Sequence, residues 1–282
     1  WHPGHPHVAA DRAPAASGDL LEWAMTRIWR WFLAVIIGGW LPVLLVTWWW
    51  NASADSTNLF FPPLADIWEQ FKFNWIWQFW GVHVMPTLQN LIVGFLLAAA
   101  IAIPLGVLIG SSATAARYVE PVVDFFRSIP PVALVPAFIL ILGLDASMRI
   151  FSIAFAASFP ILLSTIEGVR STNVVLLDTA AVFRLTRSQV LWRVRLPNAM
   201  PTVFAGLQVG FQIAFIVAIA SEVLGSGFGI GAFTLIATDT FMILDAWTGV
   251  MLLGILGYLL NIVFDLVERI SLRWYFGQKK LA

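Results

Sequence analysis

Long apolar runs without charged residues alternate with short polar connections along most of this chain. A helix that crosses a bilayer needs about 20 mostly apolar residues, and charge-free runs of roughly that length recur along the chain. They predict six membrane-spanning helices, at residues 29–50, 86–110, 119–143, 148–168, 201–222 and 246–270. We therefore expect an all-α integral membrane protein.

The segment from Val223 to Thr238 is a seventh candidate span. It carries glycines at 225, 227, 229 and 231, and each glycine costs a helix roughly 0.8–1 kcal/mol relative to alanine. We expect a loop or re-entrant turn instead, which needs cover from protein or water. Six spans also place both termini and the arginine-rich connections in the cytoplasm, as the positive-inside rule requires.

The composition agrees with a membrane location and excludes several classes of protein. Of the 282 residues, 60% are hydrophobic and 11% are charged, whereas a soluble domain has roughly 25% charged residues. Sixteen basic residues balance sixteen acidic ones, so no excess charge points to nucleic acid. Cysteine is absent and tryptophan occurs fifteen times, which excludes disulfides and is typical of aromatic belts at membrane surfaces.

No catalytic or metal-binding constellation is recognisable. Outside a His-containing leader, His83 is the only histidine, and no phosphate-binding glycine loop is present. We expect no catalytic residue, no metal and no cofactor on this chain. Residues 1–28 are predicted to be a disordered cytoplasmic leader, 29–275 the six-span domain and 276–282 a cytoplasmic tail. Residues 64–80 read as an amphipathic helix on the outer membrane surface.

The polar connection at residues 170–200 has the pattern of two capped helices. Asn173 can cap a helix that runs to about Phe183, and Thr186 with Gln189 is a capping-box pattern that opens a second helix. Pro197 is predicted to end that helix, and Pro201 suits the first turn of the next span. A solvated basic loop explains the arginines here, but a docking element for a cytoplasmic partner explains the caps and prolines as well.

The same connection resembles the E-A-A-x3-G-x9-I-x-L-P loop of the integral-membrane subunits of bacterial binding-protein-dependent ABC importers. The spacing matches throughout, at Asp178, Thr179, Ala180, Arg184, Val194, Leu196 and Pro197. Four of these residues differ in type from the motif: Asp178, Thr179, Arg184 and Val194. Arg184 replaces the glycine that normally supplies a positive φ. The substitution bears on the geometry of the turn, and Arg184 is a candidate for direct contact with the ATPase.

Three shorter motifs are similar to the nitrate/sulfonate/taurine branch of these permeases. They are Phe61-Pro62-Pro63 followed by Trp68, His83 and Thr87-Leu88; Arg127-Ser128-Ile129-Pro130-Pro131; and Ala220-Ser221-Glu222 followed by Gly227-Phe228-Gly229. Together with the loop, they extend the resemblance over residues 60–275.

The resemblance implies a permease subunit in the bacterial inner membrane. Its partners would be a second permease copy, in a homodimer, two ABC ATPase subunits that bind ATP and Mg²⁺, and an extracytoplasmic solute-binding protein; membrane lipid surrounds it and no nucleic acid is involved. Asp178, Arg184 and Arg187 are the expected ATPase contacts. The solute is expected to be a small anion such as a sulfonate, taurine, nitrate or bicarbonate. A neutral or cationic solute such as a pyrimidine precursor, or an ATP-independent secondary transporter, is the alternative.

Polar residues inside the predicted spans are candidates for the transport pathway, because charges there usually face a cavity or a partner. Arg127, with Ser128 before the Pro130-Pro131 break, either attracts an oxyanion or pairs with Asp124. Glu222 either belongs to an outer gate or caps the glycine turn.

Gln208 and Gln212, one helical turn apart, either line the pathway or hydrogen-bond neighbouring helices. The G-x-x-x-G pairs Gly106/Gly110 and Gly206/Gly210 allow helices to approach closely, within the chain or across a dimer.

Overall fold

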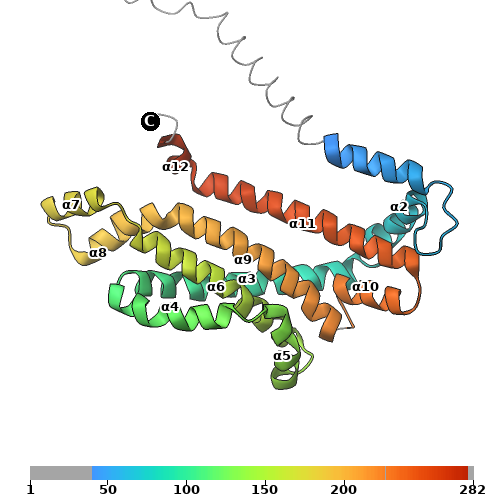
Figure 1. Cartoon of the computed structure of the whole chain (residues 1–282), viewed down its shortest axis with the longest axis horizontal. Helices are drawn as coiled ribbons and strands as arrows, with labels where there is room; N and C mark the ends of the chain where they lie inside the picture. The colour runs from blue at the N-terminus through green and yellow to red at the C-terminus, as the bar shows by residue number, and fades with distance from the viewer. Residues whose placement is uncertain (1–39, 226, 279–282) are drawn as a thin grey trace, which may run out of the picture. The chain divides into compact units, whose positions relative to one another are not determined.

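The computed structural model describes residues 40–225 and 227–278, and every regular element among these residues is helical (Figure 1). Two compact units are distinguished, Trp1–Ala65 and Asp66–Ala282. The first contains a helix over 40–53, whose Ser53 Oγ accepts a hydrogen bond from Leu64 N at 3.0 Å. The predicted leader and residues 29–39 of the first predicted span lie outside the described residues.

The second unit carries the remaining helices in the order that Figure 1 labels them. They are α2 (Leu64–Lys72, which begins at the end of the first unit), two π-helical turns (Phe73–Gln78 and Trp80–Val84), α3 (Met85–Gly110), α4 (Ala113–Arg127), a 3-10 turn (Pro131–Leu134), α5 (Val135–Leu142), α6 (Ala146–Arg170), α7 (Val174–Val182), α8 (Arg187–Val190), a π-helical turn (Leu191–Arg195), α9 (Leu196–Gly225), α10 (Ile230–Asp239), α11 (Ile243–Ser271) and α12 (Arg273–Gln278).

Four helical stretches among the described residues are long and apolar enough to cross a membrane. They are Trp80–Gly110, Ala146–Arg170, Arg187–Gly225 and Ile243–Ser271. These coincide with the second, fourth, fifth and sixth predicted spans. A total of six remains a prediction, because the first span lies partly outside the described residues and the third is bent.

The third predicted span is a bent pair of helices and not one straight helix. Ala113–Arg127 and Pro131–Leu142 meet at 86°. Pro130 and Pro131 both lack an N–H, and proline disfavours the helical conformation in the residue before it. Pro130 has φ −57° and ψ 120°, outside the helical region. The sequence did place a break at these two prolines.

Helix α6 lies at the centre of the second unit, packed along both α3 and α9. The two predicted G-x-x-x-G pairs make this contact possible. A Cβ on Gly106 would lie 2.6 Å from Thr165 Cβ, and one on Gly206 would lie 2.4 Å from Ser164 Cβ. Both pairs therefore pack within the chain, against α6.

The predicted loop at residues 223–238 is wrong for most of its length. Only the short turn between Gly225 and Ile230 separates α9 from the ten-residue helix α10. Gly231 lies inside α10, where a Cβ would come within 2.7 Å of Ile219 O. Close packing against α9 offsets the low helix propensity of glycine here. Helix α10 is too short to span a bilayer.

Pro197 does not end the second predicted helix of the 170–200 connection. The helix runs on from α8 into α9, over the 39 residues of Arg187–Gly225. A π-helical turn at Leu191–Arg195 ends two residues before Pro197. A proline ring clashes with the carbonyl four residues earlier, and the wider π turn removes that clash. Pro201 likewise lies inside α9, not at its first turn.

Candidate functional site

The segment 173–195, which we call the α7–α8 hairpin, has both of the predicted helix caps. Asn173 Oδ1 accepts a hydrogen bond from Val175 N at 2.9 Å. Thr186 Oγ1 accepts from Gln189 N at 3.3 Å, and Gln189 Oε1 accepts from Thr186 N at 2.9 Å, which completes a capping box. These caps satisfy backbone N–H groups that a helix start leaves without partners.

Arg184 takes the backbone conformation that glycine normally supplies. Its φ is +51°. Arg184 N donates to Ala181 O at 2.9 Å and Leu185 N donates to Ala180 O at 3.0 Å, the paired bonds of a Schellman motif. The turn therefore keeps its left-handed geometry despite the arginine, which bears a conformational penalty that glycine would avoid.

Residues of the recognised motif converge on one cavity of about 390 Å³. Thr179 and Ala180 of α7 face Val194 and Pro197 across it, and Trp274 and Tyr275 of α12 complete the wall. Leu196 is the first residue of α9 and is half-buried. Segments separated by more than a dozen residues in sequence thus form one compact unit.

The outer surface of the α7–α8 hairpin is both charged and apolar. Asp178, Arg184 and Arg187 are exposed, and none forms an ion pair with another described residue. Val182 and Phe183 expose 80% and 73% of their surface. Exposed apolar groups beside unpaired charges are typical of a surface that binds a partner.

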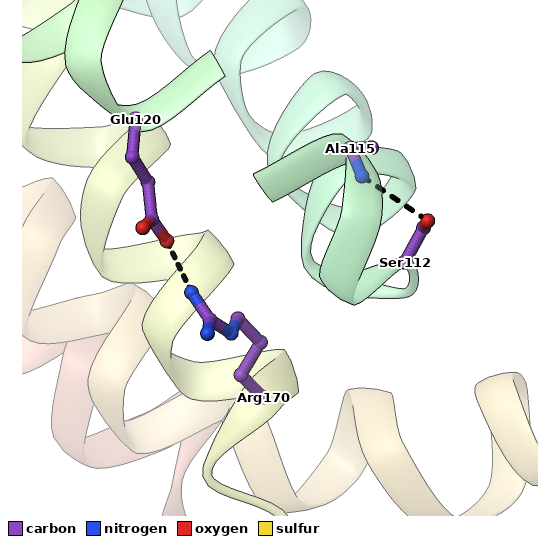
Figure 2. A network of polar contacts seen from close by, with 4 residues as sticks. All are labelled: Ser112, Ala115, Glu120 and Arg170. Carbon is purple, nitrogen blue, oxygen red and sulfur yellow. Dashed lines mark hydrogen bonds and ion pairs between the residues drawn. The ribbon is translucent and has the colours of Figure 1, made fainter. Parts of the chain in front are cut away.

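A second cavity, of about 580 Å³, lies between α4 and α6 and contains Arg127. Arg127 Nε lies 2.9 Å from Asp124 Oδ1, the internal pair that the sequence suggested. Arg170 pairs with Glu120 across the two helices, as Figure 2 shows together with the Ser112 cap on Ala115 N. Glu167 adds a third carboxylate, so carboxylates outnumber guanidinium groups in the lining.

The remaining motif residues of this region shape the bend beside that cavity. Ser128 Oγ donates to Asp124 O at 2.7 Å, and so ends α4. Pro130 and Pro131 start the 3-10 turn that leads into α5. The exposed Arg127–Asp124 pair contributes little to stability, because water screens it.

Glu222 is buried and joins three helices. Thr87 Oγ1 donates to Glu222 Oε1 at 2.6 Å, and Gly231 N donates to Glu222 Oε2 at 3.0 Å. Ile230 N donates to Thr87 Oγ1 at 3.1 Å. The carboxylate therefore fixes the start of α10 to α3 and α9. This geometry is that of a cap on the glycine turn.

Gly229 makes room for that carboxylate. Its φ is +112°, and a Cβ there would lie 2.2 Å from Glu222 Cδ. His83 Nδ1 lies 3.0 Å from Gly229 O and 3.2 Å from Gly229 N, and the tautomer of the ring decides which of the two it bonds. The His83 ring packs against Phe79 and Phe233. We call Glu222, Thr87, His83, Gly229 and Gly231 the Glu222 network.

The two glutamines of α9 differ in their surroundings. Gln208 Nε2 donates to Asp265 Oδ1 of α11 at 3.2 Å, so it hydrogen-bonds a neighbouring helix. Gln212 is exposed on the surface of α9.

The chain matches, over residues 102–276, the family described as binding-protein-dependent transport system inner membrane component. It belongs to this family. The permease is 28% identical to the taurine transport system permease protein TauC of Escherichia coli, over 88% of this chain and 93% of that protein. It is 30% identical to the nitrate import permease protein NrtB of Synechocystis, over 78% and 83% of the two chains. It is 33% identical to the bicarbonate transport system permease protein CmpB of Synechococcus elongatus, over 69% and 70%.

Solved structures support the fold of the permease. A chain of the MetNI methionine ABC transporter, in an inward-facing conformation, superposes with a TM-score of 0.58 at 22% identity, over 67% of this chain and 94% of that chain. The predicted all-α architecture of an ABC importer permease is confirmed.

Sequence reasoning missed several polar partners in the permease. Asn74 Nδ2 donates to Asp245 Oδ1 at 2.7 Å, and Gln70 Nε2 donates to the same oxygen at 2.8 Å. Asp265, the partner of Gln208, was also missed. The available signal was the charge of Asp265 inside a predicted span, because such a charge calls for a partner.

Proposed function

We propose that this permease is the membrane subunit of an ATP-driven importer and that its α7–α8 hairpin docks the ATPase. The observation that supports this proposal is the surface of the hairpin. Asp178 and Arg187 are exposed there and form no ion pair with any described residue, and the apolar Val182 and Phe183 beside them are exposed as well. Unpaired charges on the rim of such a surface would select the partner, and the apolar centre would supply affinity. In this arrangement ATP and Mg²⁺ belong to the ATPase, and the hairpin and both termini face the cytoplasm.

The helix that follows the hairpin offers a path for the motion. Arg187–Gly225 runs without a break from the hairpin to the Glu222 network. A helix moves as a rigid element, so a shift imposed by the ATPase would reach the far end of α9. Two ATPases and two permease copies, supplied by an extracytoplasmic binding protein, would use this shift for alternating access.

We propose a small anion as the solute. The names of the relatives refer to taurine, nitrate and bicarbonate. Nitrate and bicarbonate are small anions at neutral pH, and taurine is a zwitterion that carries an anionic sulfonate group. In this proposal Arg127 and Gln212 face the pathway. A cationic or neutral solute is the second candidate, and the net negative lining of the cavity between α4 and α6 favours it.

The docking proposal is tested by uptake into cells or vesicles that contain the permease with its native ATPase and binding protein. The double variant Asp178→Ala/Arg187→Ala is expected to abolish ATP-dependent uptake and to lose the ATPase in pull-downs, while the permease level in the membrane stays unchanged. Arg117→Ala, which removes an exposed guanidinium from α4, is the control. Intact uptake in the double variant would remove the docking proposal.

The solute proposal is tested on the binding protein that copurifies with the permease. Thermal-shift measurements against taurine, nitrate, bicarbonate and uncharged analogues should give stabilisation by an anion. Stabilisation by an uncharged or cationic solute alone would contradict the anion proposal and leave the docking proposal untouched.

A further inference from the structure

A basic cavity of about 510 Å³ lies where the turn after α3 meets α8. Arg187 and Arg195 line it together with the hydroxyl-bearing residues Ser111 and Ser188. Among the residues that the structure describes, no acidic side chain contributes to its wall. The cavity between α4 and α6 is different, because both of its arginines have carboxylate partners there.

The two arginines of this basic cavity have no carboxylate partner among the described residues. Arg195 Nε is buried and has no hydrogen-bond partner among the described residues. Arg187 forms no ion pair with any of them. A buried donor without a partner is costly, and more so when it is charged. The donors and the positive charge of the site are therefore complementary to a compact anion with several oxygen atoms.

We propose that this cavity binds the phosphate group of an anionic phospholipid. Arg187 and Arg195 would donate to the phosphate oxygens, and Ser188 would add a hydroxyl donor. The guanidinium groups suit this role because they present several N–H groups in a plane that matches phosphate oxygens.

The position of the cavity favours a lipid headgroup over a soluble anion. Ser111 directly follows α3, the end of a stretch long enough to cross the membrane. Trp192, 64% exposed, lies on the same turn as Arg195, and tryptophan is enriched at membrane interfaces. Apolar Leu185 and Leu191 complete the wall and suit the glycerol and first acyl carbons. Basic pockets between spanning helices are known to bind anionic headgroups.

A lipid in this position would join two parts of the permease. Ser111 belongs to the turn between α3 and α4, whereas Arg187 and Arg195 belong to the α7–α8 hairpin, which continues into α9. The bound headgroup would hold these parts together. Arg187 is shared with the proposed ATPase surface, so the test rests on Arg195, which is not among the proposed ATPase contacts.

Native mass spectrometry of the permease, purified with its copurifying subunits, tests the proposal. The protein is titrated with phosphatidylglycerol and, separately, with phosphatidylcholine of the same acyl chains. We expect one phosphatidylglycerol to bind in preference, and Arg195→Gln to weaken that binding about fivefold, since one arginine near anionic lipid contributes about that much. Arg193→Gln removes an equal charge from the same turn, but Arg193 lines the other cavity and should leave binding unchanged.

Four outcomes would overturn the proposal. Equal binding of both lipids, or equal losses in Arg193→Gln and Arg195→Gln, would leave no specific headgroup site. Displacement of bound mass by millimolar inorganic phosphate, without preference for phosphatidylglycerol, would identify soluble phosphate as the ligand. Loss of the ATPase in Arg195→Gln with unchanged lipid binding would assign this arginine to protein docking. If Arg195→Gln does not fold, Arg187→Gln, whose side chain is exposed, should show the same loss.

Discussion

The α7–α8 hairpin is stabilised by hydrogen bonds between residues close in sequence, and the Glu222 network by hydrogen bonds between residues far apart in sequence. The side-chain caps of the hairpin reach only two or three residues along the chain, from Asn173 to Val175 and from Thr186 to Gln189. In the Glu222 network, Thr87 bonds a carboxylate 135 residues away. Local caps fix the shape of a turn but not its attachment to the rest of the molecule.

The two regions also differ in the burial of their side chains. Glu222, Thr87 and Ile230 are buried, and Trp75, Val84 and Ile230 belong to one apolar cluster beside them. The α7–α8 hairpin exposes Val182 and Phe183 instead. The chain thus completes the Glu222 network by itself, and we propose that a partner completes the α7–α8 hairpin.

The largest expected effect breaks the Glu222 network through its backbone. Gly229→Ala should lower the free energy of unfolding by roughly 3–5 kcal/mol, because the residue keeps a φ that only glycine tolerates and the Cβ displaces Glu222. Unfolding in mixed micelles measures this loss. Gly227→Ala is the matched control, since no atom lies within 4 Å of its Cβ position, and an equal loss there would contradict the account.

Removing the Glu222 carboxylate should lower the free energy of unfolding somewhat less than Gly229→Ala does. Glu222→Ala is expected to destabilise the permease by about 3 kcal/mol, because Gly231 N–H loses its acceptor and a cavity remains. Thr87 Oγ1 can still donate to His83 O, at 2.9 Å, which limits the loss. Glu222→Gln keeps one acceptor oxygen and should lose roughly 1 kcal/mol. The same unfolding assay applies, and equal stability of all three proteins would show that the network is dispensable.

The separation in sequence between contacting residues determined which features the sequence could predict. The caps at Asn173 and Thr186, the pairing of Arg127 with Asp124 and four of the spans depend on neighbours within a few residues, and the structure has them. The partner of Glu222 and the pairing of Gln208 with Asp265 depend on how α3, α9 and α11 pack, which no local pattern specifies.

Two corrections have the same origin. Pro197 was expected to end a helix because a proline disrupts the regular hydrogen bonding, but the π-helical turn at Leu191–Arg195 absorbs it. Gly231 was expected to help prevent a helix, but it lies inside α10, where the close approach to Ile219 explains it. Helix propensity gave the wrong answer at Gly231 because tertiary packing reversed the local preference, and at Pro197 because the wider turn accommodates the ring.

A local change in the α7–α8 hairpin should have a smaller effect. Thr186→Ala removes the cap hydroxyl and should destabilise the start of α8 by about 1 kcal/mol. Hydrogen exchange at residues 187–190 should accelerate roughly fivefold, while exchange at residues 229–233 stays unchanged. Thr186→Ser retains the hydroxyl and serves as control. Acceleration in both segments would show that the two regions are not independent.

Arg184 allows the geometry of the turn to be separated from its charge. Arg184→Gly should stabilise the turn by about 1 kcal/mol, since glycine adopts φ +51° without strain. Arg184→Ala keeps the strain and removes the guanidinium. If this side chain contacts the ATPase, both variants should lose ATPase binding equally in a pull-down. Normal binding by the glycine variant alone would assign Arg184 a purely structural role.

The smallest expected change in stability is at Arg127. Its pair with Asp124 is exposed, so Arg127→Ala should alter the free energy of unfolding by less than about 0.5 kcal/mol. Uptake of an anion should nevertheless fall, with ATPase docking intact. Asp124→Ala, which leaves Arg127 unpaired, is the informative companion. Unchanged uptake in Arg127→Ala would return this arginine to a structural role.

The central claim, that a partner completes the α7–α8 hairpin, can be measured directly because the chain has no native cysteine. A cysteine at Val182 on α7 would carry a spin label or fluorophore, and one at Tyr118 on α4, which is 74% exposed, would serve as reference. On addition of the copurifying ATPase, we expect the label at 182 to become immobilised and protected from aqueous quencher, while the label at 118 does not change. Equal mobility at 182 with and without bound ATPase would contradict it.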